Sequence, residues 1–212
     1  MTEVLSINPL APDPDVLERA GAVLRTGGLV AYPTETVYGL AASAFVVDSV
    51  ARVFDAKQRP FSQALPVQIA DVSEVETLAR SVPPAARRLL ADFFPGPLTL
   101  IFWRQPSVSL TVTGGTNTIG LRMPDHAVAL GVLRAFGAPL VCPSANLTGR
   151  RAPMSARDVL EDLDGVIDLV LDGGETADRT PSTVLDLTTD PARILREGKI
   201  TRAELEPYLA LA

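Results

Sequence analysis

The sequence predicts an α/β domain built on a mixed, twisted β-sheet that helices flank. Segments with helical and with strand-like spacing of apolar residues alternate along almost the whole chain, as is typical of such sheets. The length of 212 residues suits one domain, and 47% hydrophobic residues supply a core for it. With 21% charged residues, the chain is too apolar and too weakly charged to remain disordered.

In the first half of the chain, capping residues followed by apolar residues at helical spacing predict three helices. Asp13 and Pro14 form a favourable N-cap and first-turn pair, and Gly27-Gly28 ends that segment. Asp48 caps the second helix, and prolines open and end the third. The predicted helices lie within residues 13–28, 48–57 and 83–94, and short apolar runs predict strands at 29–32 and 65–69.

The same alternation continues through the middle and the second half of the chain. Three strands are predicted at 98–103, 107–113 and 118–123, so we expect an antiparallel insertion there. The box from Ser155 to Asp158 predicts a capped helix start. Further helices are predicted at 126–136 and 201–211, and further strands at 139–142, 168–171, 183–187 and 193–195.

Composition excludes several classes of function. The formal charge of −6, from 25 acidic and 19 basic side chains, argues against a constitutive nucleic-acid binder. A single cysteine cannot form an internal disulfide, and no Cys/His cluster has zinc spacing, so we expect no protein-built metal site. The single histidine, His126, is interpreted as a solvated capping residue at a helix start. No apolar stretch approaches the ~20 residues of a membrane span and no signal peptide is recognised, so we expect a cytoplasmic protein.

Two polar loops in the first third of the chain are candidate binding segments. Residues 33–40 (PTETVYGL) follow a predicted strand, and ligands of α/β proteins bind beyond the carboxyl ends of strands. The alternative is a strand-to-helix turn with a capping threonine. Lys57 and Arg59 (KQRP) lie in a loop that proline fixes and could clamp phosphate oxygens. Alternatively, they only complement the dipole at a helix C-terminus.

Two later segments also combine polar groups with a predicted strand. The alternation of a strand places Thr118, Gly120 and Arg122 on one face, where glycine leaves room for a ligand and arginine needs an anionic partner. Residues 142–149 (CPSANLTG) offer hydroxyl, amide and backbone donors after a buried strand. We expect Cys142 to be a buried thiol without a nucleophilic role.

Seven motifs together are far more specific than any one of them. Ser182, which begins a predicted strand, and Arg196, which ends the next, would each be interpreted alone as surface side chains. The motifs are PTETVYGL at Pro33, KQRP at Lys57, FPGPLT at Phe94, IGLRMP at Ile119, PSANLTG at Pro143, STVLD at Ser182 and REG at Arg196. In order and spacing, over about residues 15–200, this series closely resembles the YrdC-like (TsaC-like) family of threonylcarbamoyl-AMP synthases.

The resemblance implies a fold, an activity and partners. The fold would be a twisted mixed sheet flanked by helices around a large concave cleft, as one domain over residues 1–212, in the short form without an extra C-terminal domain. The activity would be nucleotidyl transfer that makes L-threonylcarbamoyladenylate and pyrophosphate from L-threonine, bicarbonate or CO2, and ATP, for the t6A modification of tRNA. Mg2+ is expected with ATP. Expected partners are the tRNA threonylcarbamoyl-transfer proteins, in transient contact, and at most weak contact with tRNA.

The resemblance also implies two sets of ligand-binding residues. The threonine site would comprise Thr36, Gln68, Arg122 and Ser182. The ATP site would comprise Lys57, Arg59, Gln63, Thr118, Cys142, Ser144, Asn146, Ala152 and Arg196. In this set Cys142 and Ala152 would contribute backbone groups only, and Asn146 would serve either ligand. Lys57 and Arg59 are expected to be the catalytic residues, because their charges offset those of the phosphates.

The chain departs from the family pattern KxRPxxxPLIVH at two positions. Ala64 stands in place of the proline and Gln68 in place of the histidine. Glutamine keeps a donor and an acceptor but cannot titrate, so the threonine contact could survive whereas a proton-transfer role could not. Two other functions stay open: a carbamoyl-transferase-like YrdC module, and a double-stranded RNA-binding or ribosome-maturation module, which would present a broad basic face.

Overall fold

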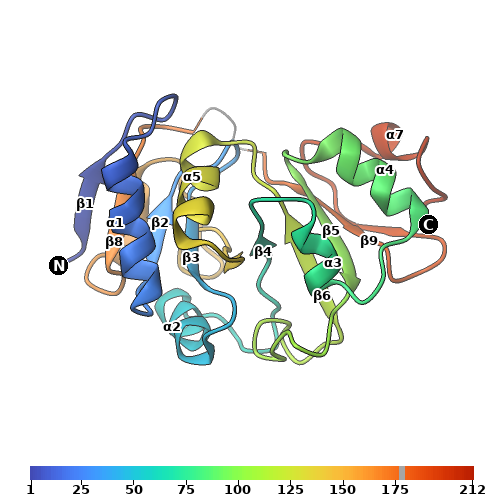
Figure 1. The fold of residues 1–212 in the computed structure, drawn as a ribbon, viewed down its shortest axis with the longest axis horizontal. Helices are drawn as coiled ribbons and strands as arrows, with labels where there is room; N and C mark the ends of the chain where they lie inside the picture. The colour runs from blue at the N-terminus through green and yellow to red at the C-terminus, as the bar shows by residue number, and fades with distance from the viewer. Residues whose placement is uncertain (177–179) are drawn as a thin grey trace.

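Ten strands form one sheet in the computed structural model, which describes residues 1–176 and 180–212 (Figure 1). The strands are β1 (Glu3–Ser6), β2 (Val30–Tyr32), β3 (Gly39–Ser43), β4 (Val67–Gln68), β5 (Leu98–Trp103), β6 (Thr118–Arg122), β7 (Leu140–Val141), β8 (Leu169–Asp172), β9 (Thr183–Asp186) and β10 (Arg193–Arg196). The helices are α1 (Pro14–Arg25), α2 (Val47–Lys57), α3 (Glu74–Leu78), α4 (Pro84–Phe93), α5 (Ala127–Phe136), α6 (Ala156–Leu163) and α7 (Arg202–Leu205).

The sheet order brings the motif segments together. The strands follow one another as β1-β8-β2-β3-β7-β4-β6-β5-β9-β10. β8 is parallel to β1 and β2, β4 to β6, and β5 to β9, whereas the other neighbouring pairs are antiparallel. The predicted mixed α/β sheet is therefore confirmed. Because β3, β7, β4, β6, β5 and β9 are consecutive, the motif residues at their ends become neighbours.

Helices cover the sheet, and several of them begin with the capping residues that the sequence predicts. α1 and α5 lie side by side in front of the strands at one end of the molecule (Figure 1). Asp13 caps α1 by accepting from the Asp15 backbone N–H at 2.9 Å, and Ser155 forms the predicted capping box with Asp158. The longest helix in the described parts of the chain, α1, has 12 residues, and no helix there has the length and apolarity of a membrane span.

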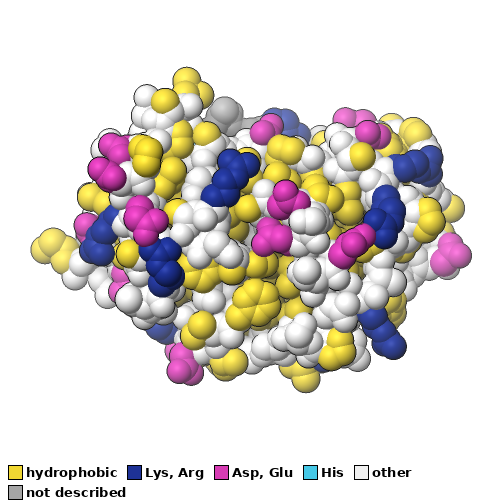
Figure 2. All heavy atoms as spheres, viewed as in Figure 1, with side chains coloured by type: hydrophobic (Ala, Val, Ile, Leu, Met, Phe, Trp, Pro, Cys, Tyr) yellow, Lys and Arg dark blue, Asp and Glu magenta, His cyan; other side chains and the backbone are white. Residues whose placement is uncertain are grey.

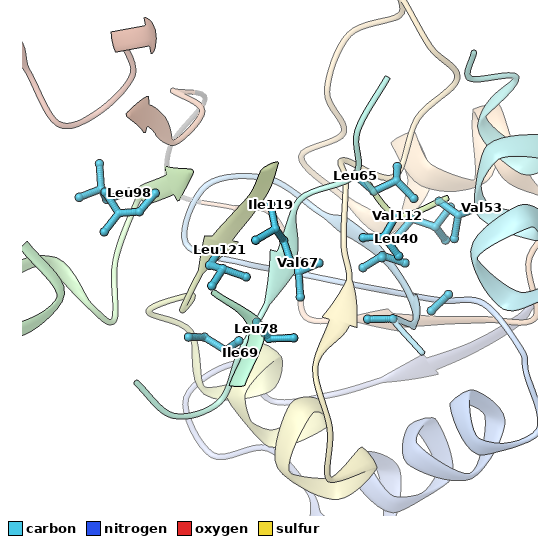
Figure 3. Packing of buried hydrophobic residues seen from close by; sticks show 14 of the residues in the cluster. Leu40, Val53, Leu65, Val67, Ile69, Leu78, Leu98, Val112, Ile119 and Leu121 are labelled. Atoms are coloured by element: carbon cyan, nitrogen blue, oxygen red, sulfur yellow. The ribbon is translucent and has the colours of Figure 1, made fainter. Parts of the chain in front are cut away.

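The core consists of two clusters of buried apolar side chains. The larger cluster joins the sheet to α2, α3, α4 and α6, and the smaller one lies between the sheet, α1 and α5. Figure 3 shows Leu40, Val53, Leu65 and Val112 gathered in the larger cluster. Val112 comes from the segment between β5 and β6, and its carbonyl accepts from the Leu65 backbone N–H at 2.9 Å. That segment is thus anchored beside the loop that follows α2.

The predicted strand at 107–113 is wrong. β5 and β6 pair antiparallel as expected, but residues 104–117 between them form turns. Arg104 Nη1 donates to the carbonyls of Gln105 and Val108 at 3.2 and 2.9 Å, and these contacts hold the chain in a folded loop. Val108 and Val112 are buried because they anchor this loop, so their spacing imitates a strand without forming one.

Other boundaries differ from the sequence-based expectations. The final helix is only α7, and β1, β3 and α3 were not predicted. β3 is fully buried and consists of small residues except for Leu40, so it lacks the alternation that marks a strand with one solvated face. Asp48 lies in the first turn of α2, where the N-cap position is Val46.

Candidate active site

A cavity of about 360 Å³ lies where the strand-end loops meet, within the size range of small-molecule sites. It is lined by ten of the predicted site residues: Thr36, Arg59, Gln68, Thr118, Arg122, Cys142, Ser144, Ala152, Ser182 and Arg196. These come from the loop after β2, the loop after α2, β4, β6, the segment from β7 to α6, and the ends of β9 and β10. Lys57, Gln63 and Asn146 do not line it.

Arg122 is held in one orientation by three protein acceptors. Its Nη2 donates to Glu35 Oε1 at 2.7 Å and to Thr36 Oγ1 at 3.0 Å, and its Nε donates to the Gly96 carbonyl at 3.3 Å. Nη1 has no acceptor among the described residues. The Arg122 and Glu35 side chains are only 10% and 16% exposed, so their ion pair is poorly screened by water. The predicted need of Arg122 for an anionic partner is met here by Glu35.

The loop that carries Glu35 and Thr36 is also a hydrogen-bonded turn. Thr34 Oγ1 accepts from the backbone N–H groups of Thr36 and Val37, both at 3.2 Å. This side-chain capping is the alternative considered for the PTETVYGL segment. The turn and the binding surface are the same structure, because the capping fixes the Thr36 hydroxyl against Arg122.

Gln68 is oriented by a buried tyrosine. Tyr32 OH donates to Gln68 Oε1 at 3.0 Å, so the Gln68 amide N–H groups remain for a ligand. Burial raises the pKa of Tyr32 well above its usual value, and the hydroxyl stays protonated as a donor. Gln68 also pairs in parallel register with Arg122 on the neighbouring strand. Sequence reasoning missed Tyr32, whose only signal was its place at the end of a buried strand.

Arg59 also lines the cavity. It follows Gln58, which ends α2 in the left-handed conformation with φ 49°. Arg59 Nε donates to the Gln63 carbonyl at 3.1 Å and its Nη2 to the Ala64 carbonyl at 2.8 Å. Partial burial lowers the pKa of Arg59. Gln63 therefore contributes through its backbone oxygen, while its side chain is exposed outside the cavity.

Lys57 lies behind the cavity wall, unlike the expected phosphate contact. It is 2% exposed, and its Nζ donates to the carbonyls of Ser144 and Asn146 and, at 3.4 Å, to Asn146 Oδ1. Burial lowers its pKa to about 8. Asn146 also uses its polar atoms internally: Oδ1 accepts from Ser144 Oγ, and Nδ2 donates to the carbonyls of Leu147 and Arg150. Lys57 and Asn146 thus support Ser144 from behind.

A chain of polar groups joins β5, β9 and β10. Ser182 Oγ lies 3.0 Å from Thr99 Oγ1, and Arg196 donates to Ser182 through Nε to the carbonyl at 3.0 Å and through Nη2 to Oγ at 3.1 Å. Thr99 also lines the cavity. It was missed although it is the last residue of the FPGPLT motif.

Cys142 and His126 are not reactive groups of this cavity. Burial raises the pKa of Cys142 to about 12, so the thiol stays protonated, and it packs tightly against Gly39. His126 occupies the N-cap position of α5 but makes no capping hydrogen bond, and its buried Nδ1 has no partner among the described residues. Burial lowers the pKa of His126, which does not line the cavity. The parts of the chain that the structure describes hold no cluster of three His, Cys, Asp or Glu residues able to bind a metal.

Comparisons with known proteins agree with this architecture. The threonylcarbamoyl-AMP synthase of Bacillus subtilis is 44% identical over 210 residues, which are 99% of this chain and 59% of that protein. The crystal structure of Pyrococcus abyssi Sua5 complexed with L-threonine superposes with a TM-score of 0.95 at 38% identity and covers 100% of this chain and 63% of that one. Escherichia coli YciO superposes with a TM-score of 0.89 at 28% identity over 99% and 100% of the two chains.

The chain thus spans about three fifths of the length of the first two relatives, but the family match extends over most of the chain itself. The Sua5/YciO/YrdC family model, described as "Telomere recombination", matches residues 22–198. The motif series therefore identified the family correctly, and this chain belongs to the Sua5/YciO/YrdC family.

Proposed function

We propose that the chain is an L-threonylcarbamoyladenylate synthase, a nucleotidyltransferase that acts on L-threonine, bicarbonate or CO2, and ATP. The observation that carries this proposal is the cavity, where Arg59, Arg122 and Arg196 converge among hydroxyl and amide groups, and where no carboxylate of residues 1–176 or 180–212 lines the wall. Such a lining suits polyanionic substrates. The names of the relatives, and the L-threonine in the Sua5 structure, support the choice of substrates.

The cavity lining includes donors that suit each of the two substrates. Arg122, whose Nη1 has no acceptor among the described residues, lines the cavity together with the Thr36 hydroxyl and the Gln68 amide, and this donor set fits the carboxylate and hydroxyl of threonine. Arg59 and Ser144 line the same cavity, and a guanidinium with a hydroxyl suits phosphate oxygens. Two donor sets in one cavity would allow the reactants to be held for direct attack.

The reaction requires positioning more than acid–base chemistry. The threonine ammonium and bicarbonate give the carbamate, water and a proton, with formation of the N–C bond and loss of a C–O bond. A carbamate oxygen then bonds to the α-phosphorus of ATP, and the bond to pyrophosphate breaks. The arginines offset the charge that develops on the phosphates. Gln68 cannot accept a proton, so the proton is released to water or to phosphate oxygens.

Mg2+ is proposed to enter with ATP. Among the described residues, the cavity lining supplies hydroxyl and amide oxygens but no carboxylate, so the phosphates and water would provide most of the metal ligands. The side chains that fit this role are Ser144 and Thr118, which line the cavity. The metal would supply charge neutralisation at the phosphates.

The product is proposed to pass to tRNA threonylcarbamoyl-transfer proteins in the cytoplasm, for t6A modification of tRNA. On the face shown in Figure 2, basic side chains are scattered among acidic ones, which does not favour a broad RNA-binding surface on that face.

Pyrophosphate release is the direct test of the proposed reaction. We expect release that needs ATP, threonine and bicarbonate together. Release that is unchanged without threonine would contradict the proposal.

A further inference from the structure

A second hollow lies at the end of β5, outside the cavity described above. It has a volume of about 250 Å³ and is lined by Arg80, Trp103, Arg104, Pro106 and Asn117, none of which lines the larger cavity. Trp103 is the single tryptophan of the chain and is 46% exposed, although tryptophan side chains are on average well buried. The indole ring is therefore accessible to a ligand in this hollow.

Hydrogen bonds between distant segments hold the hollow in shape. The Arg80 backbone N–H donates to the Trp103 carbonyl at 2.7 Å. The Arg104 backbone N–H donates to the Asn117 carbonyl at 2.9 Å. The Arg104 guanidinium donates through Nη2 to Asn117 Oδ1 at 3.3 Å and through Nη1 to the Val108 carbonyl at 2.9 Å. Because the walls are already tied to one another, little ordering is needed when a ligand binds.

The hollow carries two positive charges that no described carboxylate offsets. Within residues 1–176 and 180–212, no acidic side chain lines it, and neither Arg80 nor Arg104 forms an ion pair. The exposed Arg80 side chain has no hydrogen-bond acceptor in the same ranges, and the buried Nε of Arg104 has no partner there. A ligand of this hollow would therefore be expected to carry negative charge.

The side chains of the hollow match the parts of a nucleotide. An accessible indole face stacks on a planar base, and this contact tolerates any base because every base has a π-face. A guanidinium suits phosphate oxygens. Asn117 uses its Oδ1 on Arg104, so its amide N–H groups remain as donors to the carbonyl oxygens of a base. An acidic side chain of a peptide would satisfy the arginines but would offer no ring to the indole.

We propose that this hollow binds one unpaired nucleotide, with its base stacked on Trp103 and its phosphate held by Arg80. The site lies outside the cavity and goes beyond the proposed function. A site for one nucleotide needs no broad basic face, so it is compatible with the net charge of −6. The nucleotide is either free or part of an unpaired RNA strand, and the two sources share the same chemistry.

The experiment uses the fluorescence of Trp103, which is the chain's own reporter because no other tryptophan contributes. The protein is titrated with UMP and with a short oligouridylate, since the proposed reaction uses an adenine nucleotide and gives uracil no role. An oligoglutamate of equal charge controls for the arginines alone. Trp103 pairs across the strands with Thr118, which lines the cavity, so fluorescence could also respond to a ligand bound in the cavity.

A pair of variants separates these two sources of a fluorescence change. Arg80→Gln removes a charge of the hollow without touching the cavity lining. Arg134→Gln is the matched control, because Arg134 is also an exposed arginine but lies on α5, which Figure 1 places away from β5. Both variants should release pyrophosphate at the wild-type rate.

We expect saturable quenching by the uracil probes, with a Kd that Arg80→Gln raises about tenfold and Arg134→Gln leaves unchanged, as loss of one charged hydrogen bond would. Tighter binding of oligouridylate than of UMP would assign the site to an RNA strand, and equal binding would assign it to a free nucleotide. No quenching by either probe, equal quenching by oligoglutamate, or a wild-type Kd in Arg80→Gln overturns the inference while the proposed function stands. Failure of the wild-type protein to release pyrophosphate would contradict the proposed function alone.

Discussion

Gly198→Ala should destabilise the protein and displace cavity residues, although Gly198 itself does not line the cavity. A Cβ at Gly198 would lie 2.2 Å from the Pro181 carbonyl oxygen, 2.6 Å from the Ser182 carbonyl carbon and 2.7 Å from the Thr183 nitrogen. All three are backbone atoms, so β9 or the turn after β10 must move. Overpacking typically costs about 1–3 kcal/mol, and contacts this short place the cost near ~3 kcal/mol. For a protein of this size that corresponds to a fall in Tm of roughly 6–12 °C.

The assay for this variant combines thermal unfolding with kinetics, and the chain offers a control. Gly165 has φ +77° but open space around its missing Cβ, so Gly165→Ala should cost only ~1 kcal/mol and leave the kinetics unchanged. Because Ser182 and Arg196 flank the Gly198 contact, Gly198→Ala should also raise the KM for ATP. A Tm no lower than that of Gly165→Ala, with wild-type KM values, would refute the packing argument.

Three further predictions concern the arginines and the buried lysine. Arg122→Ala should raise the KM for threonine roughly ten- to a hundredfold with a smaller effect on ATP, since it removes a charged donor; equal effects on both substrates would contradict the assigned carboxylate contact. Arg59→Ala should abolish pyrophosphate release while the Tm stays near wild type, and retained turnover would exclude the phosphate contact. Lys57→Met tests the burial of Lys57 through the pH dependence of stability. Burial lowers the pKa of folded Lys57 to about 8, whereas the pKa of the unfolded side chain is about 10.5. The unfolded state therefore binds more protons than the folded state between these two pH values. The unfolding free energy of wild type relative to Lys57→Met should therefore rise with pH across this window, and a difference that is flat with pH would show that burial does not lower the pKa of Lys57.

The binding loops could be predicted because each carries its own local signal. Polar residues directly after buried strands mark strand ends, and the alternation of β6 placed Thr118, Gly120 and Arg122 on the cavity side, which is confirmed for all three. The capping box at Ser155 is equally local, because the residues that form it are neighbours in sequence.

Which side chains of the KQRP and PSANLTG loops line the cavity could not be predicted in the same way. Lys57 and Arg59 look equivalent in sequence, yet Arg59 lines the cavity while Lys57 is buried against carbonyls of a segment nearly ninety positions away. Only the docking of that segment decides which cation meets a ligand. The predicted strand at 107–113 was wrong for a related reason. The buried valines of the loop at 104–117 pack against distant residues, and their spacing gives the apolar pattern of a strand.

The identity of the product tests the central claim most directly. The purified protein is incubated with ATP, threonine and isotopically labelled bicarbonate, and the mixture is analysed by mass spectrometry. The account predicts threonylcarbamoyl-AMP that carries the label, absent when any one substrate is omitted and absent with Arg59→Ala. Consumption of ATP without a labelled threonine adduct of AMP would contradict it.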